Sequence, residues 1–254
     1  MKHALFLILF ASSAAATEQP LGFTVTGKTV EPGTHELVAS STLRFGRPRD
    51  YLRVESLAGF GYGFSKSIEA QVLIAIAVES AGLDRRAAEG GGQVRLRWQP
   101  LEGRADALGL GLVGTVGLSP TSVFVEARLN VEKWFGEFLF ALNASVDYRV
   151  RRDDASGPGL HLEQSAGVVY RLANNFTTGV EFRNRLGFER GSYYGAAIFA
   201  GPVLGYRSKS AWFSLAALPQ VAAVKAQSQV GNGEALELRD NERVVVRLQL
   251  GFDL

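Results

Sequence analysis

Residues 122–151 read SVFVEARLNVEKWFGEFLFALNASVDYRVR, and this stretch decides the fold. Apolar and polar side chains alternate with a period of two on each side of Phe135-Gly136. Such alternation is typical of β-strands, in which successive side chains point to opposite faces. Each half is about twice as long as an ordinary soluble strand of about five or six residues. The stretch therefore predicts a hairpin of two long strands joined by a tight turn.

The same alternation recurs along almost the whole chain. Near the C-terminus, Val246, Leu248 and Leu250 share one face, and Arg247 and Gln249 occupy the other. A soluble β-sandwich turns its charged face outward, whereas a transmembrane barrel turns apolar side chains to lipid and polar ones to its lumen. Here the apolar face is the more continuous one. We predict strands at 34–46, 51–64, 67–80, 92–100, 106–118, 122–134, 137–151, 160–173, 176–189, 193–206, 211–220 and 243–254.

This pattern predicts an all-β fold, a transmembrane antiparallel up-and-down β-barrel of about 12 strands, with ten or fourteen strands as the alternatives. Periplasmic turns should be short and external loops longer. The long hydrophilic connections 81–91, 152–159 and 221–242 fall on the external side, although the external connections 47–50 and 119–121 are short. We expect 221–242 to gate the outer mouth.

Several local features refine this prediction. The glycine run at 90–92 is interpreted as a loop hinge, and Pro219 as a bulge or strand end, because proline cannot donate a ladder hydrogen bond. Aromatic residues gather beside the predicted periplasmic turns: Tyr62, Phe64, Trp98, Trp134, Tyr170, Phe176, Tyr206, Trp212 and Phe252. They indicate an aromatic girdle at the membrane interface.

The chain divides into three parts. Residues 1–16 have a basic start, an apolar stretch from Ala4 to Phe10 and an A-x-A site at 14–16, which predicts a cleaved signal peptide and export to the outer membrane of a Gram-negative bacterium. Residues 17–32 form an N-terminal segment that either folds inward as a plug or trails into the periplasm. Residues 33–254 form the barrel.

Composition excludes several other classes of protein. There is no cysteine, which excludes disulfides, and only His35 and His161 remain after export, so we expect no metal site and no cofactor. No segment holds the ~20 apolar residues of a transmembrane helix. Lys and Arg, 27 in all, nearly balance 25 Asp and Glu, so nucleic acid is not an expected partner.

Motifs at both ends of the chain support a family resemblance. The N-terminal group is GFTVT at 22–26 and EPG at 31–33, and the turn YGFSK stands at 62–66. The C-terminal group is GPVLGY at 201–206, Trp212, LPQ at 218–220, NER at 241–243 and LGF at 250–252. These motifs resemble an uncharacterised family of Gram-negative outer-membrane β-barrels, a domain of unknown function.

The resemblance implies an outer-membrane location and a barrel architecture, and it implies no activity. Two positions depart from the family pattern, because Lys66 replaces an acidic residue and Leu254 replaces a terminal aromatic residue. The second departure either weakens the terminal signal read by the barrel-assembly machinery or leaves Phe252 to serve instead. Beyond that machinery, the expected partners are outer-membrane lipid, lipopolysaccharide and a small-molecule solute.

The lumen-facing residues are the informative ones for function. Their basic and acidic members nearly balance, so Arg–Glu ladders between strands are expected. Side chains from both walls can nearly fill a twelve-stranded lumen of roughly 24 Å backbone diameter. These residues either brace the barrel or line a solute path: Arg53, Glu55, Glu69, Arg95, Arg97, Glu126, Arg128, Asp147, Arg149, Glu181, Arg183, Arg185 and Arg247.

The leading functional hypothesis is a narrow passive channel or transporter for a small polar or amphipathic solute. A closed barrel with a structural, surface-binding or scaffold role is the alternative, and an outer-membrane lipid hydrolase is the third. His161 shares a predicted lumen face with Glu163 and Ser165, but residues four apart on a strand lie about 13 Å apart, too far for His161 to activate Ser165. We therefore predict no catalytic residues and no enzyme.

Overall fold

In the computed structural model, the described residues are 19–48, 50–81, 86–152, 158–173, 175–225, 235–238 and 241–254. The predicted signal peptide at 1–16 lies outside them. Among the described residues, no helix is long and apolar enough to cross a membrane.

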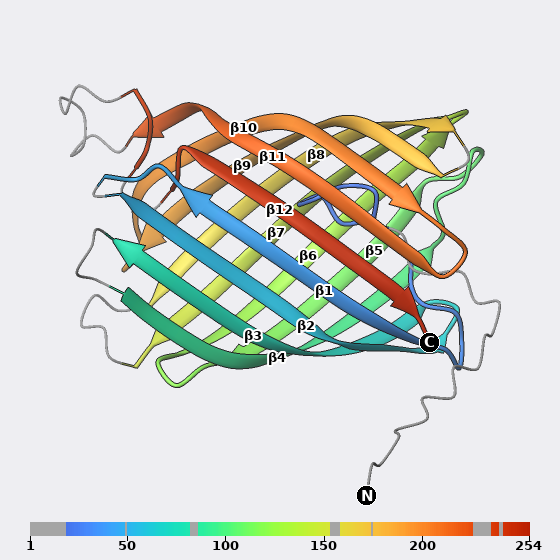
Figure 1. Ribbon diagram of the computed structural model, residues 1–254, viewed down its shortest axis with the longest axis horizontal. Coiled ribbons are helices and arrows are strands. Elements are labelled where there is room, and N and C mark those ends of the chain that lie inside the picture. Colours follow the sequence, from blue (N-terminus) through green and yellow to red (C-terminus); the bar gives the residue numbers. More distant parts are fainter. Residues whose placement is uncertain are drawn as a thin grey trace, which may run out of the picture.

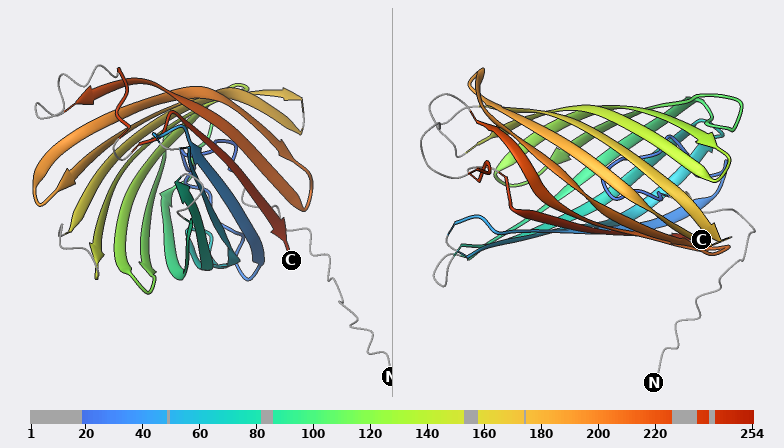
Figure 2. Two further views of the ribbon diagram at one scale, coloured as in Figure 1. Left: turned by 60° about the vertical axis from the view of Figure 1, so that its left-hand side comes forward. Right: turned by 90° about the horizontal axis from the view of Figure 1, so that it is seen from above.

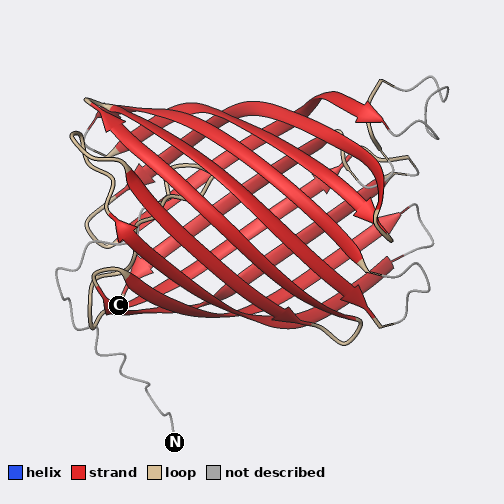
Figure 3. Ribbon diagram, turned by 180° about the vertical axis from the view of Figure 1, so that it is seen from behind, coloured by secondary structure: helices blue, strands red, loops and turns tan. Residues whose placement is uncertain are grey.

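The described chain forms twelve antiparallel strands in one closed barrel (Figures 1 and 3). Each strand pairs with its neighbours in sequence, and β1 pairs with β12 to close the sheet. The predicted twelve-stranded barrel is therefore confirmed. The strands are β1 (His35–Phe45), β2 (Tyr51–Ser65), β3 (Ile68–Ala81), β4 (Arg86–Leu101), β5 (Gly109–Leu118), β6 (Ser122–Phe135), β7 (Phe138–Arg151), β8 (Gly159–Ala173), β9 (Phe176–Glu189), β10 (Ser192–Arg207), β11 (Ala211–Lys225) and β12 (Val244–Asp253).

Two strands are longer than the sequence predicted. Gly90 to Gly92 lie inside β4, paired with residues 74–76 of β3, so the interpretation of this run as a loop hinge is wrong. A Cβ atom on Gly91 would lie 2.5 Å from the carbonyl oxygen of Leu118, and the close approach of β5 therefore requires glycine there. β11 continues past Pro219, which is paired with Val244 and forms the last register pair between β11 and β12. Beyond it, β11 pairs with β10 alone.

The two faces of the barrel wall differ as the alternation predicts. Val72 and Ile74 are 63% and 67% exposed on the outer face, where lipid would cover them. Glu69 and Asn130 are buried on the inner face. The girdle interpretation holds for Trp98, which is 46% exposed, and fails for Trp212, which is only 4% exposed.

The inner position of Trp212 has a specific partner. Its indole nitrogen donates a 2.8 Å hydrogen bond to the buried carboxylate of Glu36 on β1. Trp134 is also partly buried, against a cluster of apolar residues inside the barrel. Trp134 and Trp212 lie beside turns, which suggested the membrane interface, but their positions in the alternation of each strand point them into the lumen.

Residues 19–32 run inside the barrel before β1 begins (Figures 1 and 2). They form no long strand, and most of their side chains are buried. An isolated bridge between Pro32 and Gly63 marks where this segment reaches the wall. The C-terminus and the start of β1 lie at the end of the barrel with the short turns, which is the periplasmic end in bacterial barrels (Figure 1).

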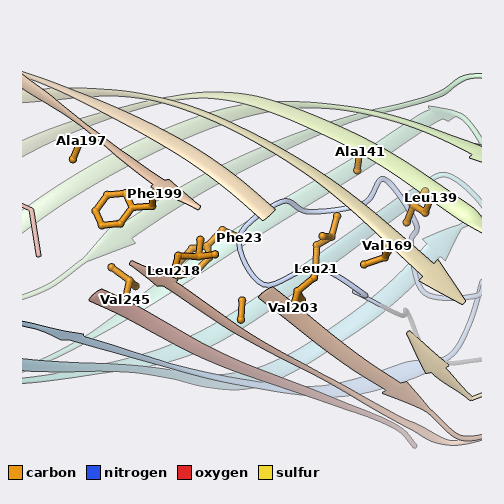
Figure 4. Packing of buried hydrophobic residues seen from close by; sticks show 11 residues of the cluster. Leu21, Phe23, Leu139, Ala141, Val169, Ala197, Phe199, Val203, Leu218 and Val245 are labelled. Carbon is orange, nitrogen blue, oxygen red and sulfur yellow. The ribbon is translucent and has the colours of Figure 1, made fainter. Parts of the chain in front are cut away.

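The N-terminal segment packs against one apolar sector of the lumen (Figure 4). Leu21 and Phe23 contribute to a buried cluster with side chains from β7, β8, β10, β11 and β12. The wall members are Leu139, Ala141, Val169, Ala197, Phe199, Val203, Ala216, Leu218 and Val245. The prediction of a lumen lined by charged ladders did not anticipate this sector.

The close approach of β8 and β9 generates a first prediction. A Cβ atom on Gly179 would lie 2.0 Å from the carbonyl oxygen of Val168, whereas one on Gly114 would meet no atom within 4 Å. We expect Gly179→Ala to lower the free energy of unfolding by about 1–3 kcal/mol through overpacking. Gly114→Ala should leave it unchanged or slightly raise it. Urea unfolding in lipid vesicles measures both, and equal stabilities would contradict the close contact.

Candidate functional site: the lumen and its N-terminal segment

One carboxylate holds the first turn of the N-terminal segment. Glu181, on the inner face of β9, accepts hydrogen bonds from the backbone amides of Gly22 at 3.1 Å and of Phe23 at 2.8 Å. The amide of Thr24 donates to the same carboxylate. Glu181 is 2% exposed, so these bonds form away from bulk water. Three consecutive backbone amides thus converge on one buried carboxylate, a group whose two oxygens can accept several hydrogen bonds at once.

Further acceptors continue along the segment. Asn143 of β7 accepts from the amide of Val25 at 2.6 Å and donates to the carbonyl of the same residue at 2.9 Å. Glu132 of β6 accepts from the amide of Gly27 at 2.9 Å, and Glu69 of β3 from the amide of Val30 at 3.0 Å. The acceptors therefore come from four different strands of the wall.

Donors from the wall satisfy the carbonyl groups of the segment. Arg128 donates to the carbonyl of Phe23 at 3.2 Å, and Arg97 to that of Thr26 at 3.4 Å. Gln249 and Ser214 both donate to the carbonyl of Leu21, at 3.2 Å and 3.3 Å. A buried, irregular backbone needs such partners because an unpaired amide or carbonyl costs free energy comparable to a lost hydrogen bond.

Phe23 anchors the segment with its ring. The guanidinium groups of Arg183 and Arg247 lie 4.6 Å and 5.2 Å from its ring centroid, where a cation–π attraction is favourable. Its ring also belongs to the apolar cluster of Figure 4. Side chains of the wall thus hold the segment along most of its length, and the segment occupies part of the cross-section of the lumen.

A cavity remains between the segment and the wall. The space open to the centres of water molecules is about 80 Å³, and the cavity is lined by residues of β1 to β6, β11 and β12 together with Gln19 and Val25 of the segment. Four arginines face it, Arg95, Arg97, Arg128 and Arg247. Only two acidic residues, Glu36 and Glu126, line it. A space of this size, partly open to solvent, has room for several water molecules.

All predicted lumen residues are buried or half-buried on the inner face. The expected ion pairs form at several of them. Arg53 contacts both Glu55 and Glu79 at 2.9 Å, and Arg128 contacts Glu126 at 2.7 Å. Arg97 lies 3.6 Å from Glu69, and Arg183 pairs with Glu163 at 2.6 Å. Two other members have different contacts: Asp147 contacts His161, and Arg149 lies over the ring of Phe124.

Arg185 lies within electrostatic reach of Glu163 and Glu242. The contacts of Arg95, Glu181 and Arg247 are with groups other than carboxylates: Gln71 for Arg95, the segment backbone for Glu181, and Phe23 for Arg247. The predicted set is therefore not one continuous ladder.

His161 has partners on neighbouring strands instead of its own. Its Nδ1 atom lies 3.3 Å from Asp147 of β7, and its Nε2 atom lies 3.0 Å from the hydroxyl of Tyr194 on β10. Tyr194 reaches across Gly187 of β9, where a Cβ atom would overlap its ring. Glu163 is instead engaged by Arg183. No Ser or Thr hydroxyl is among the contacts found for His161 in the described part of the chain.

The outer mouth is partly covered by the end of the β11–β12 connection. Glu242 is 1% exposed. It lies 3.6 Å from Arg44, which belongs to β1, and 2.7 Å from Arg47, which follows the end of β1. Asn241 donates to the buried carboxylate of Glu237 at 2.6 Å. Burial alone would raise the pKa of Glu242, but the guanidinium groups of Arg44 and Arg47 outweigh it and hold this pKa below its ordinary value.

Sequence reasoning missed most of the segment's partners. Asn143, Ser214 and Gln249 stand at inward-facing positions, but nothing in their own strands distinguishes them from other polar lumen residues. Leu21 and Phe23 offered a weak signal, since two large apolar residues ahead of β1 need a place to be buried. In the described residues, no group of three or more His, Asp or Glu side chains is arranged to hold a metal ion.

Comparisons with known proteins agree with this architecture. Residues 141–254, a little under half of the chain, match the family described as "Family of unknown function (DUF6662)". No curated protein matches the sequence significantly. The resemblance to an uncharacterised outer-membrane barrel family, drawn above from the motifs, is thereby confirmed.

Solved structures share the fold at low sequence identity. The COG4313 outer membrane channel from Pseudomonas putida F1 has a TM-score of 0.62 and 9% identity, covering 90% of this chain and 98% of that one. The NanC porin has a TM-score of 0.53 and 14% identity, with coverages of 86% and 100%. The β domain of the Bordetella autotransporter BrkA has a TM-score of 0.54 and 10% identity, with coverages of 88% and 100%.

Likeness at this identity shows the fold alone. That fold is the twelve-stranded barrel of the outer membrane, and its relatives include channels and porins. The protein thus has the fold of a twelve-stranded outer-membrane β-barrel, and its residues 141–254 match a family whose function is unknown.

The carboxylate of Glu181 generates a prediction about the segment. In Glu181→Gln, an uncharged amide replaces the carboxylate, and its NH₂ group cannot accept a backbone hydrogen bond. Losing charge-assisted bonds of about 1.5–3 kcal/mol should speed hydrogen exchange of residues 22–24 roughly ten- to a hundredfold. Glu79→Gln, which removes a lumen carboxylate paired with Arg53, is the control and should leave this exchange unchanged. Equal exchange in both variants would contradict the anchoring role of Glu181.

The lowered pKa of Glu242 generates a prediction about the outer mouth. Because its pKa is lower in the folded protein, its ion pairs contribute stability above the ordinary carboxyl pKa, and this is lost as pH falls through the lowered value. A nitroxide on Ala235→Cys should therefore stay immobile at pH 7 and at pH 5, and become mobile only well below about pH 4.3. Adding Glu242→Gln should make it mobile at pH 7, whereas Glu102→Gln, in an exposed pair with Arg104, should not.

Proposed function

We propose that the protein is a narrow channel for small polar or amphipathic solutes, and that residues 19–32 restrict the flow through it. The observation that carries this proposal is the partly open cavity of about 80 Å³ beside the segment, whose lining is about equally polar and apolar and includes four arginines. A barrel with only a structural role needs no such space, because close packing of the lumen would be more stable.

The way the segment is held supports a restricting role. Its backbone is bonded to side chains of the wall and not to a strand edge, apart from the bridge at Pro32. Each of these bonds can break singly without opening the barrel wall, whose own ladder closes through β1 and β12. A segment held in this way can shift inside a fixed barrel. The likeness to a channel and a porin is consistent with this function and does not specify a solute.

Planar-bilayer recordings of single channels test the proposal. The exported chain should give small, discrete openings, and deletion of residues 17–32 should give a conductance several times larger, because the obstruction is removed. The double variant Glu132→Gln/Glu181→Gln keeps the segment but weakens its attachment, so it should open more often with two conductance levels.

A gel-shift assay must show that each variant is a folded, heat-modifiable barrel. Silence from every folded variant would contradict the channel and favour the closed structural barrel. Equal conductance with and without residues 17–32 would retain the channel and contradict the restricting role of the segment.

A further inference from the structure

We propose that the lumen cavity binds a small organic carboxylate through Arg95 and Arg247, and that the solutes of the channel belong to this class. This inference rests on the proposed function and names its substrate class. It starts from the observation that lumen acids and lumen arginines, balanced in number along the sequence, are not balanced around the cavity.

The first step is how the acids are used. Glu181 and Glu132 accept hydrogen bonds from backbone amides of the N-terminal segment, and Glu69 divides its carboxylate between the amide of Val30 and the guanidinium of Arg97. The hydrogen bonds of these carboxylates are made largely to the segment, and within the described residues only Glu69 of the three forms an ion pair with an arginine. Arginines elsewhere in the lumen are left without a carboxylate partner.

Among the four arginines that line the cavity, Arg95 and Arg247 are in this position. Arg95 donates to the uncharged side chain of Gln71 at 3.2 Å. Arg247 lies 5.2 Å from the ring centroid of Phe23, and its Nε atom is buried without a hydrogen-bond partner. Within the part of the chain that the structure describes, neither forms an ion pair with a carboxylate, in contrast to Arg97 and Arg128.

The second step is that both residues face the same cavity. Arg95 comes from β4 and Arg247 from β12, and each lies within electrostatic reach of the other and of Arg128. Glu126 is the carboxylate that acts most strongly on the charge of Arg95, and it is already paired with Arg128 at 2.7 Å. Glu36, the other acid of the lining, accepts from Trp212. The cavity therefore carries an excess of positive charge.

The third step concerns the chemistry of the ligand. A guanidinium presents a planar fork of donors that matches the two oxygens of a carboxylate, and burial strengthens that pairing. Next to the arginines, the cavity lining includes the apolar side chains of Leu57, Leu73 and Val113. A carboxylate with a compact apolar body would satisfy both parts of this surface, whereas a fully hydrated inorganic anion would leave the apolar part uncovered.

Calorimetric titration of the detergent-solubilised protein tests the inference without any need for conduction. The probe is benzoate, and benzamide is its uncharged comparator of nearly the same shape. Benzoate should bind the wild type at least tenfold more tightly than benzamide, and Arg95→Gln or Arg247→Gln should each weaken benzoate about tenfold or more, as expected for a lost charge-assisted bond. Arg247→Lys should restore part of the loss, because it keeps the charge.

The matched control is Arg149→Gln, since Arg149 faces the lumen over the ring of Phe124 and does not line the cavity. It should bind benzoate like the wild type. Equal binding of benzoate and benzamide, or unchanged binding by a folded Arg95→Gln/Arg247→Gln double variant, would overturn the proposal. Inorganic phosphate binding more tightly than benzoate would overturn the carboxylate class.

Reversal potentials in a salt gradient separate this inference from the proposed function. A preference for anions that disappears in Arg95→Gln/Arg247→Gln supports both the channel and the carboxylate site. Conduction without anion preference, together with no benzoate binding, would overturn the carboxylate site and leave the channel standing. Specific benzoate binding in a barrel that never conducts would support the site and contradict the channel.

Discussion

Every backbone amide and carbonyl inside the membrane needs a hydrogen-bond partner, and this requirement organises the whole molecule. The wall satisfies it by closing β1 onto β12, so that no strand edge is left open. The N-terminal segment has no strand beside it for most of its length, so its backbone is satisfied by side chains. Glu181, Asn143 and Gln249, each on a different strand, supply those partners because their positions in the alternation point them inward.

Holding the segment in this way changes the electrostatics of the lumen. Carboxylates that could pair with arginines are engaged by backbone amides, and the cavity beside the segment is lined by four arginines and only two acidic residues. A count of charges along the sequence is therefore a poor guide to the sign of the field that a solute meets. What matters is which charges are already paired: Arg128 forms an ion pair with Glu126, whereas Arg95 and Arg247 form none within the described residues.

The period-two alternation was sufficient to predict the strands, their number and the polar members of the lumen, because lipid imposes one apolar face on every strand. It was insufficient where both faces are apolar. In β10 the run from Ala196 to Leu204 loses its alternation, and its inward members Phe199 and Val203 form the apolar sector that receives Leu21 and Phe23. Two other predictions were wrong because they relied on residue type. The glycines at 90–92 suggested a loop although they are paired within β4. Trp212 suggested the interface because it lies near a turn, although its position in the alternation points it inward, toward Glu36.

The two ends of the lumen are restricted by the same kind of contact. Near the periplasmic side, carboxylates of the wall hold a segment that precedes β1, and at the outer mouth the carboxylate of Glu242 lies between arginines at the end of β1. In both places the segment is short, and its partner belongs to the barrel wall or to the residues just beyond it. Under the proposed function, a solute whose carboxylate binds Arg247 would draw this guanidinium away from the ring of Phe23, so binding of the solute and attachment of the segment would be coupled. Such coupling would require no rearrangement of the strands, since the segment is attached to the wall mainly through side chains.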